Sequence, residues 1–295
     1  MLTNRPTEWI DSLNSKKLKK LRHQAKISKK QEQEPDYIGQ IKKYDNLFQE
    51  VPQITFLTHN VVESDRLIAQ NLLPQSLPVL QVPDDFQDTL FQSLLQKYPM
   101  GDPKGDELWN QYSQALPKLD KLLRSFRDYL ENHYGMWAYI SAPFIKDLAK
   151  FLNGAPTLEV MAGNGTISAG LRELDQTVIA TDNKGWIAEN ETGKHSVTEI
   201  EKLDALDAWK KYQDQVKFVI MSWSPDGVSI DWNLLQKMRE TNPDVTLICI
   251  GEKFGSSGSK PFWQGAHYVN PKATEQLNQH FARFDLVHDQ VYLIQ

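Results

Sequence analysis

The spacing of apolar residues changes near residue 134 and divides the chain into two parts. Before that point, apolar residues recur at helical spacing and predict helices over 7–30, 63–73, 84–98 and 105–133. Pro117 is expected to interrupt the last of these, because proline removes a helical hydrogen bond and clashes with the preceding turn. A short strand is expected at Ile54-Thr-Phe-Leu57. Residues 1–134 are therefore predicted to form a mostly helical N-terminal region.

After residue 134, short β-prone runs alternate with helical segments. The expected strands are 157–162, 177–181, 197–203, 216–221, 245–250 and 286–294. The expected helices are 144–152, 166–174, 205–213, 231–241 and 271–283. Strands that alternate with helices form a mainly parallel sheet covered on both faces. The predicted fold class is α/β, with a doubly wound sheet over 135–295 and the helical region appended to it.

Composition places the chain among folded proteins that lack a disulfide framework. Forty per cent of the residues are hydrophobic and ten per cent are aromatic, which is enough for a large core. The single cysteine, Cys249, lies in an apolar run and is expected to be buried. No apolar run approaches the roughly 20 residues of a membrane span, and the N-terminus has no signal-peptide core. We expect a cytoplasmic protein with no membrane contact; nothing in the sequence indicates its oligomeric state.

Charge is unevenly distributed along the chain. Residues 1–134 contain 18 Lys/Arg and 18 Asp/Glu, whereas residues 135–295 contain 15 and 20. Within the first part, Ser15 to Lys30 contains eight Lys/Arg and no acid. This basic arm, residues 16–30, is either a solvent-exposed helix face or a frayed terminus, or else a segment that contacts RNA or a membrane surface. It contains no aromatic residue for base stacking, and the acidic second part argues against a broad nucleic-acid surface.

The stretch from Thr157 to Leu174 is the strongest motif in the sequence. A short strand with Glu159 inside it leads into Gly163 and Gly165, and a helix is expected to begin at about Thr166. Glycines allow a tight turn and a close approach of the backbone to a ligand. Backbone N–H groups at the start of a helix have no partner within it, so they can hold the polar end of a ligand.

Polar residues also follow the later strands. The carboxyl ends of these strands carry Asp182-Asn183, Asp204-Ala205, Ser222-Trp223-Ser224-Pro225 and Gly251-Glu252. In a parallel sheet these ends share one edge, and ligands bind in the crevice beside it. The sequence therefore predicts one ligand site at this edge.

Together these motifs resemble the class I, Rossmann-like, S-adenosylmethionine-dependent methyltransferases over residues 135–295. The first motif of that family has an acid followed by glycines two, four and six residues later. Here Glu159 is the acid, Gly163 and Gly165 match two of the glycines, and Met161 departs from the third. The resemblance implies that Asp182 binds the ribose hydroxyls and that the acid of Asp204-Ala205 reaches the adenine amino group. Ser222-Trp-Ser-Pro225 stands where many amine and nucleic-acid methyltransferases have Asp/Asn-Pro-Pro-aromatic.

The resemblance implies a full set of site residues. The cofactor-binding residues implied are Glu159, Ala162, Gly163, Gly165, Asp182, Asn183, Asp204, Ala205 and Ser222. The catalytic residues implied are Ser222, Trp223 and Pro225, with S-adenosyl-L-methionine as cofactor and no metal. A small-molecule acceptor is the preferred substrate. The alternatives are an RNA or protein methyltransferase that uses the basic arm, and a cofactor-binding module without activity.

Several assignments have alternatives that the sequence leaves open. A dinucleotide fingerprint requires a glycine three residues after Gly165, where this chain has Ser168. Asp204 could merely cap the next helix. Trp186, Trp223 and Trp263 follow strand ends and are expected to wall the site, or else to pack into the core. His267 and Asp226 are the candidates for a general base, and no histidines have metal-ligand spacing.

Overall fold

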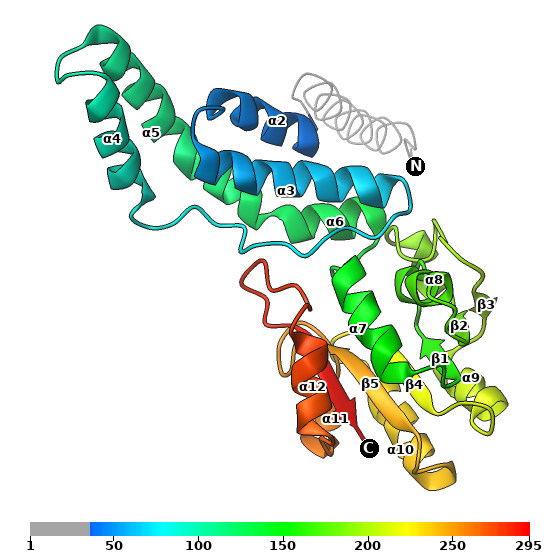
Figure 1. Ribbon diagram of the computed structural model, residues 1–295. Helices are drawn as coiled ribbons and strands as arrows, with labels where there is room; N and C mark the ends of the chain where they lie inside the picture. The colour runs from blue at the N-terminus through cyan, green and yellow to red at the C-terminus, as the bar shows by residue number, and fades with distance from the viewer. Residues whose placement is uncertain (1–35) are drawn as a thin grey trace, which may run out of the picture.

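The computed structural model describes residues 36–295, and its first part is helical (Figure 1). The helices are α2 (Tyr37–Leu47), α3 (Pro52–Ala69), α4 (Phe86–Lys97), α5 (Pro103–Arg124) and α6 (Phe126–Tyr134). Their buried apolar side chains form one core cluster that extends from Ile38 to Tyr139 and also includes Ala282 and Phe284. The predicted helix over 7–30 and the basic arm lie outside the described residues.

The second part is built on a six-stranded sheet with the order β3-β2-β1-β4-β5-β6. The strands are β1 (Thr157–Val160), β2 (Val178–Asp182), β3 (Glu201–Lys202), β4 (Phe218–Ser222), β5 (Thr246–Gly251) and β6 (Gln290–Ile294). The first five run parallel, and β6 pairs antiparallel with β5. All four residues of β1 are buried, as expected for a central strand covered on both faces. The predicted α/β fold with a mainly parallel sheet is confirmed.

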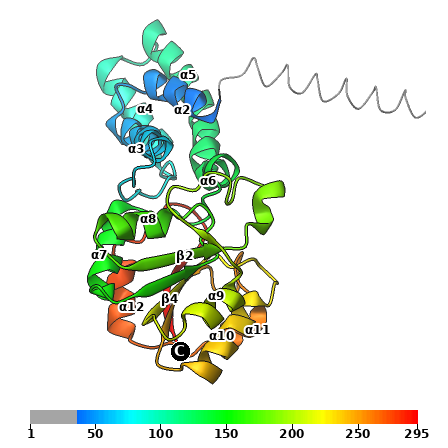
Figure 2. The same ribbon diagram turned by 90° about the vertical axis from the view of Figure 1, so that its right-hand side faces the viewer.

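Helices cover both faces of this sheet (Figures 1 and 2). One face packs against α7 (Ala142–Leu152), α8 (Thr166–Glu173) and α12 (Pro271–Asn278). The other face packs against α9 (Ala205–Tyr212), α10 (Ile230–Thr241) and α11 (Lys260–Gly265). A short 3-10 helix, η1 (Gly185–Ala188), follows β2. The strand order reverses between β1 and β4, which is where doubly wound folds bind their ligands.

Local sequence explains the helix that joins the two parts. Ser141 accepts a hydrogen bond from Phe144 N and caps α7, and proline occupies the first turn, where its missing N–H is not needed. Just before it, Gly135 has a φ of +61° and ends α6. A Cβ at Gly135 would lie 2.6 Å from the carbonyl carbon of Glu191, so only glycine allows this close approach.

Several predicted elements differ from the structure. Ile54–Leu57 is not a strand but part of α3, because Val61, Ile68 and their neighbours continue the apolar stripe at helical spacing. Helix α5 continues through Pro117 and ends at Arg124. Helix α12 ends at Asn278 rather than at residue 283, because Phe281 and Phe284 turn into the two cores beyond it.

The composition led us to expect a buried cysteine and no membrane-spanning segment. Cys249 is buried, and burial raises the pKa of its thiol. Within residues 36–295, no helix is long and apolar enough to cross a membrane.

Candidate functional site

A cavity of about 790 Å³ lies at the carboxyl ends of β1, β2 and β4. Most of the residues expected at the site line it, namely Glu159, Ala162, Gly163, Asp182, Asn183, Asp204, Ala205, Ser222, Trp223 and Pro225. Gly165 does not line the cavity; it precedes α8 with a φ of +81°. The fold thus brings ten residues from four separate stretches of the chain to one place.

The turn after β1 is held by backbone conformation and by Asp182. Met161, Gly163 and Gly165 all have positive φ angles, of +54°, +56° and +81°. Met161 therefore adopts at this turn a conformation that glycine adopts without strain. Its side chain lines the cavity and packs partly against the core cluster beneath the sheet.

Asp182 is buried at the end of β2 and connects two turns. Its Oδ2 accepts a hydrogen bond from Gly163 N at 2.9 Å, and its Oδ1 accepts one from Lys184 N at 2.6 Å. A carboxylate has about four lone-pair positions, so two further donors can still be accepted. Asp182 therefore holds the glycine turn in place and retains capacity to bind a ligand.

Glu159 lies beneath the turn, at the start of α8. Its Oε2 accepts hydrogen bonds from Ser168 N, at 2.9 Å, and from Ser168 Oγ. Burial raises the pKa of Glu159 to about 7, although the bonds from Ser168 and the charge of Arg172 act in the opposite direction. Glu159 borders the cavity, but its hydrogen-bonding partner is the helix.

Asp204 has the capping role that the sequence left open, and it also lines the cavity. Its Oδ1 accepts hydrogen bonds from Leu206 N and Asp207 N, both at 2.9 Å, and caps α9. These bonds use one carboxylate oxygen and leave Oδ2 for another donor. The capping and binding roles of Asp204 are therefore compatible.

Two of the three tryptophans expected to wall the site line the cavity. Trp186 and Trp223 do so, whereas Trp263 follows the alternative that the sequence left open and packs into the core. Trp263 is buried in the core, and its Nε1 donates to Ser257 O at 2.7 Å because the loop after β5 folds back over the ring. Trp137, in the segment 135–141 between α6 and α7, also lines the cavity, and the sequence analysis did not include it in the site.

Trp137 and Trp223 lie side by side, with ring centroids 6.1 Å apart and planes tilted by 34°. Trp137 Nε1 donates to Thr192 Oγ1 at 3.0 Å, and Trp223 Nε1 donates to Asp289 Oδ2 at 3.1 Å. Both indoles thus have their only donor occupied, and their orientation is fixed.

A buried ion-pair network lies behind Trp223. The guanidinium of Arg127, on α6, bonds to Asp285 and Asp289 and lies 5.4 Å from the centroid of the Trp223 ring. Burial alone would lower the pKa of Arg127, but these two carboxylates raise it. The network connects the helical region directly to the wall of the cavity.

Ser224 is a second site residue that sequence reasoning did not single out. It lines the cavity with only 4% of its surface exposed, and its buried Oγ has no hydrogen-bond partner among residues 36–295. Buried hydroxyls are normally paired. The signal in the sequence was its place within Ser222-Trp-Ser-Pro225.

The charged side chains that line the cavity are all acidic among the described residues. Its lining contains the acids Glu159, Asp182, Glu189, Asp204 and Asp226. Within residues 36–295, no Lys, Arg or His side chain lines it. Its donors and acceptors therefore suit a cationic or neutral ligand better than an anionic one.

The two candidates for a general base lie in different places. Asp226 lines the cavity, whereas His267 is exposed and outside it. In the described part of the chain, no cluster of His, Cys, Asp and Glu could hold a metal ion.

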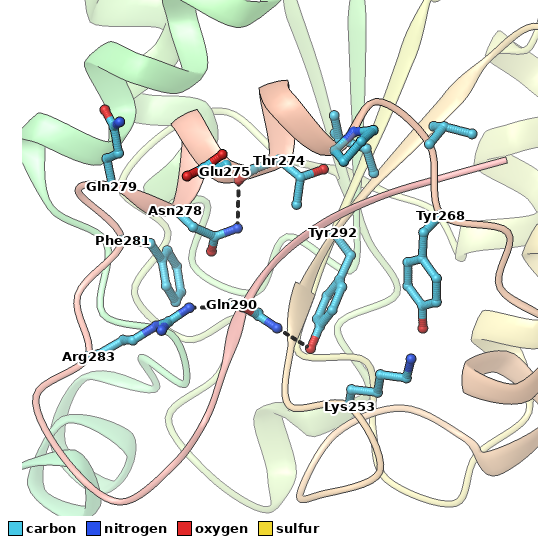
Figure 3. A pocket seen from close by; sticks show the side chains of 13 residues that line it. Lys253, Tyr268, Thr274, Glu275, Asn278, Gln279, Phe281, Arg283, Gln290 and Tyr292 are labelled. Carbon is cyan, nitrogen blue, oxygen red and sulfur yellow. Dashed lines mark hydrogen bonds between the residues drawn. The ribbon is translucent and has the colours of Figure 1, made fainter.

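A second cavity, of about 840 Å³, lies beside the edge strand β6 (Figure 3). It shares no lining residue with the first cavity, and its charges are mixed, with Lys253, Arg283 and Glu275. The strand edge here is already occupied, because the amide of Asn278 pairs with both Val291 N and Val291 O. None of the residues expected at the ligand site lies in this cavity.

Comparison with known proteins gives similarity of fold only. No protein-family model matches the chain, and no curated protein sequence matches it. The fold is similar to that of human N-acetylserotonin methyltransferase in complex with S-adenosylmethionine, at 11% identity and a TM-score of 0.33, over 52% of this chain and 51% of that one. It is also similar to a protein of the NADB-Rossmann superfamily from Streptococcus agalactiae (12% identity, TM-score 0.30, 52% and 67% of the two chains).

A third similar structure is the mitomycin 7-O-methyltransferase (11% identity, TM-score 0.30, 71% and 67% of the two chains). The chain thus spans about half the length of the human enzyme and two thirds of the other two. At these TM-scores the likeness carries no argument about chemistry.

Proposed function

We propose that this chain is an S-adenosylmethionine-dependent methyltransferase that acts on a small-molecule acceptor. The observation that carries the proposal is the cavity at the carboxyl ends of β1, β2 and β4. It combines a glycine turn, an acid at the end of β2 and an acid after β3, with no cation among the described residues that line it. The cofactor carries a positive sulfonium and a positive amino group against a single carboxylate, so its net positive charge suits this cavity.

The carboxylates that line the cavity can accept hydrogen bonds from the cofactor. Asp182 would accept hydrogen bonds from the two ribose hydroxyls, since a carboxylate can accept from both at once. Asp204 would accept the adenine amino group through Oδ2, which its helix cap does not use. The remaining contacts would come from the other predicted cofactor-binding residues that line the cavity, which are Glu159, Ala162, Gly163, Asn183, Ala205 and Ser222.

When bound, the cofactor supplies an electrophilic methyl group on its sulfonium. Methyl transfer is an in-line displacement, and alignment and exclusion of water account for most of what the protein contributes. Trp223 and Pro225 would form the wall that excludes water, and Ser222 would orient the acceptor beside it. An acceptor that is already a good nucleophile needs no general base, and Asp226 is the carboxylate at the rim that could take a proton.

Ser168 is the residue that disfavours a dinucleotide in this cavity. It stands where the dinucleotide fingerprint requires a third glycine, which lets the helix approach the strand closely. Here a buried Ser168 side chain fills that place and bonds to Glu159. An RNA acceptor finds no cation among the described residues that line the cavity, so it would depend on residues 16–30.

The test is calorimetric titration of the full chain with S-adenosylmethionine, with its demethylated product S-adenosylhomocysteine, and with NAD as the matched control. We expect both sulfur compounds to bind in the micromolar range and NAD to bind at least about a hundredfold more weakly. Failure of both sulfur compounds to bind below millimolar concentration contradicts the proposal.

A further inference from the structure

Several residues outside the predicted cofactor-binding set line the cavity, and we call this group the acceptor half. The acceptor half comprises Trp137, Trp223, Ser224, Asp226 and apolar neighbours such as Ile140 and Val228. It lies between the junction that follows α6 and the segment that follows β4. Its chemistry differs from that of the cofactor half and limits what the acceptor can be.

The two tryptophans offer ring faces and no free donor. Both indole N–H groups are already bonded, to Thr192 Oγ1 and to Asp289 Oδ2. These hydrogen bonds fix the orientation of both rings, and what remains for a ligand is their apolar surface. Such a surface favours planar apolar or aromatic groups and also cations.

Ser224 provides the one buried polar atom of this half that has no partner among residues 36–295. Its hydroxyl is enclosed, and the loop around it is fixed by the bond from Gly258 N to Ser224 O at 2.8 Å. Leaving a buried hydroxyl unpaired is unfavourable, so a ligand that brings one polar group to it gains a hydrogen bond. A hydroxyl can donate or accept a hydrogen bond, so Ser224 does not select between a ligand group that donates and one that accepts.

The charge of the cavity lining selects among acceptors by their own charge. Asp226 lies on the exposed rim, and no Lys, Arg or His among the described residues lines the cavity. Arg127, the cation behind the wall, is buried and bonded to two carboxylates, Asp285 and Asp289. A carboxylate or phosphate on the acceptor would thus meet negative charge without compensation.

We propose that the methyl acceptor is a neutral or positively charged aromatic molecule that lies against Trp137 and Trp223, with one polar group on Ser224. This inference rests on the proposed function for its chemistry. The preference for ring and charge is a property of the cavity itself. It can therefore be measured whether or not the cofactor binds.

The test uses three probes with the same ring and different charge, which are tryptamine, indole-3-ethanol and indole-3-acetate. Each is titrated into the full chain by calorimetry, with and without saturating S-adenosylhomocysteine. We expect tryptamine and indole-3-ethanol to bind at least about tenfold more tightly than indole-3-acetate. Equal or tighter binding of the anion overturns the charge selection, and binding of none of the three overturns the aromatic site.

Three variants locate the interaction. Trp137→Leu should weaken all three probes about fivefold, whereas Trp109→Phe, on α5 and outside the cavity, should leave them unchanged. Asp226→Asn should reduce the preference for tryptamine over indole-3-acetate, whereas Asp214→Asn, exposed and outside the cavity, should not. Ser224→Ala should weaken at least one probe; unchanged affinity for all three would overturn the role of its hydroxyl.

The two proposals fail in different ways. If S-adenosylhomocysteine does not bind but the probes bind with the expected order, the methyltransferase assignment fails and the ring and charge selectivity stands. If S-adenosylhomocysteine binds and the anionic probe binds best, the assignment stands and the acceptor class is wrong.

Discussion

Met161 is the residue at which this chain departs most from the motif that it otherwise matches. Its φ of +54° lies in the left-handed region, where a side chain costs roughly 1–2 kcal/mol and glycine costs little. Met161 thus has a backbone conformation that favours glycine, although it carries a side chain. Contact of the Met161 side chain with the core cluster beneath the sheet offsets part of that cost.

Comparison of Met161→Gly with Met161→Ala separates strain from packing. Both variants lose the side chain, but only glycine relieves the backbone. We expect Met161→Gly to be more stable than Met161→Ala by about 1 kcal/mol, measured by urea unfolding monitored by tryptophan fluorescence. If the alanine variant is equally stable or more stable, the turn is not strained at this position.

Glu159 should make the stability of the protein depend on pH. Its pKa is raised from 4.5 to about 7 in the folded state. Between these values the folded protein binds a proton more tightly than the unfolded chain does. Stability is therefore lost as pH rises through this range, by up to about 3 kcal/mol. Glu159→Gln keeps a hydrogen-bonding group beside Ser168 but removes the titration.

Urea unfolding of the wild type and of Glu159→Gln at pH 5 and pH 8 measures this effect. We expect the variant to gain stability relative to the wild type as pH rises. Glu173→Gln, exposed on α8, the helix that carries Ser168, is the control and should show no such gain. A difference between wild type and Glu159→Gln that is constant with pH would contradict the raised pKa.

The residues expected to bind the cofactor could be placed at one site from the sequence, because each lies at or just after the carboxyl end of a strand. Asp182 and Ser222 are the last residues of β2 and β4, so the parallel sheet alone brings them together. Trp263 lies about a dozen residues beyond β5, where the path of the loop decides the direction of the side chain, and no periodicity reports that path. Trp137 precedes the sheet altogether and reaches the site only through the packing of the helical region.

At the scale of elements, the polar residues Ser141 and Asp204 mark the starts of helices, whereas Pro117 does not mark the end of one. Ser141 and Asp204 cap helices as their residue types favour. Pro117 leaves α5 unbroken, because Tyr112, Leu116 and Leu119 continue its buried stripe across the proline. Tertiary packing therefore outweighs the lost hydrogen bond, which the local sequence could not show.

Asp204 allows its capping role to be separated from its proposed binding role. Asp204→Asn keeps an oxygen that can cap α9 but removes the charge, whereas Asp204→Ala removes both. We expect Asp204→Ala to lose about 1 kcal/mol of stability and Asp204→Asn to lose little. Both variants should weaken S-adenosylhomocysteine binding, by about tenfold or more, in calorimetric titration.

The asparagine variant is decisive for the binding role. If Asp204→Asn binds S-adenosylhomocysteine as tightly as the wild type, Asp204 is a helix cap and not a ligand residue. Asp214→Asn, on the surface after α9, serves as the charge control and should change neither stability nor affinity.

At the scale of the whole molecule, the helical region and the sheet are joined by charge as well as by packing. Arg127 on α6 bonds to Asp285, Asp289 and the carbonyl of Trp137. Its two acids occupy the loop before β6, which explains why that strand begins at Gln290 rather than at the predicted residue 286. Sequence analysis found both parts but not this link, because Arg127 lies more than 150 positions from either acid.

Removal of Arg127 should destabilise the whole molecule. Arg127→Met keeps the bulk of the side chain but leaves Asp285 and Asp289 buried without their cation. Burial already raises the pKa of Asp289 even with Arg127 present. We expect a loss of about 3–5 kcal/mol in urea unfolding. Arg124→Met breaks a half-exposed ion pair with Asp120 one turn earlier and should lose about 1 kcal/mol or less.

The triple variant Arg127→Met/Asp285→Asn/Asp289→Asn tests whether the loss comes from unpaired charge. With the two carboxylates neutralised, most of the lost stability should return, because the cost lies in burying uncompensated acids rather than in losing the pair. The amide oxygen that Asp289→Asn introduces would still accept from Trp223 Nε1, so the wall of the cavity should be kept and tryptamine should bind nearly as in the wild type. A triple variant as unstable as Arg127→Met would show that the arginine acts through packing and not through charge.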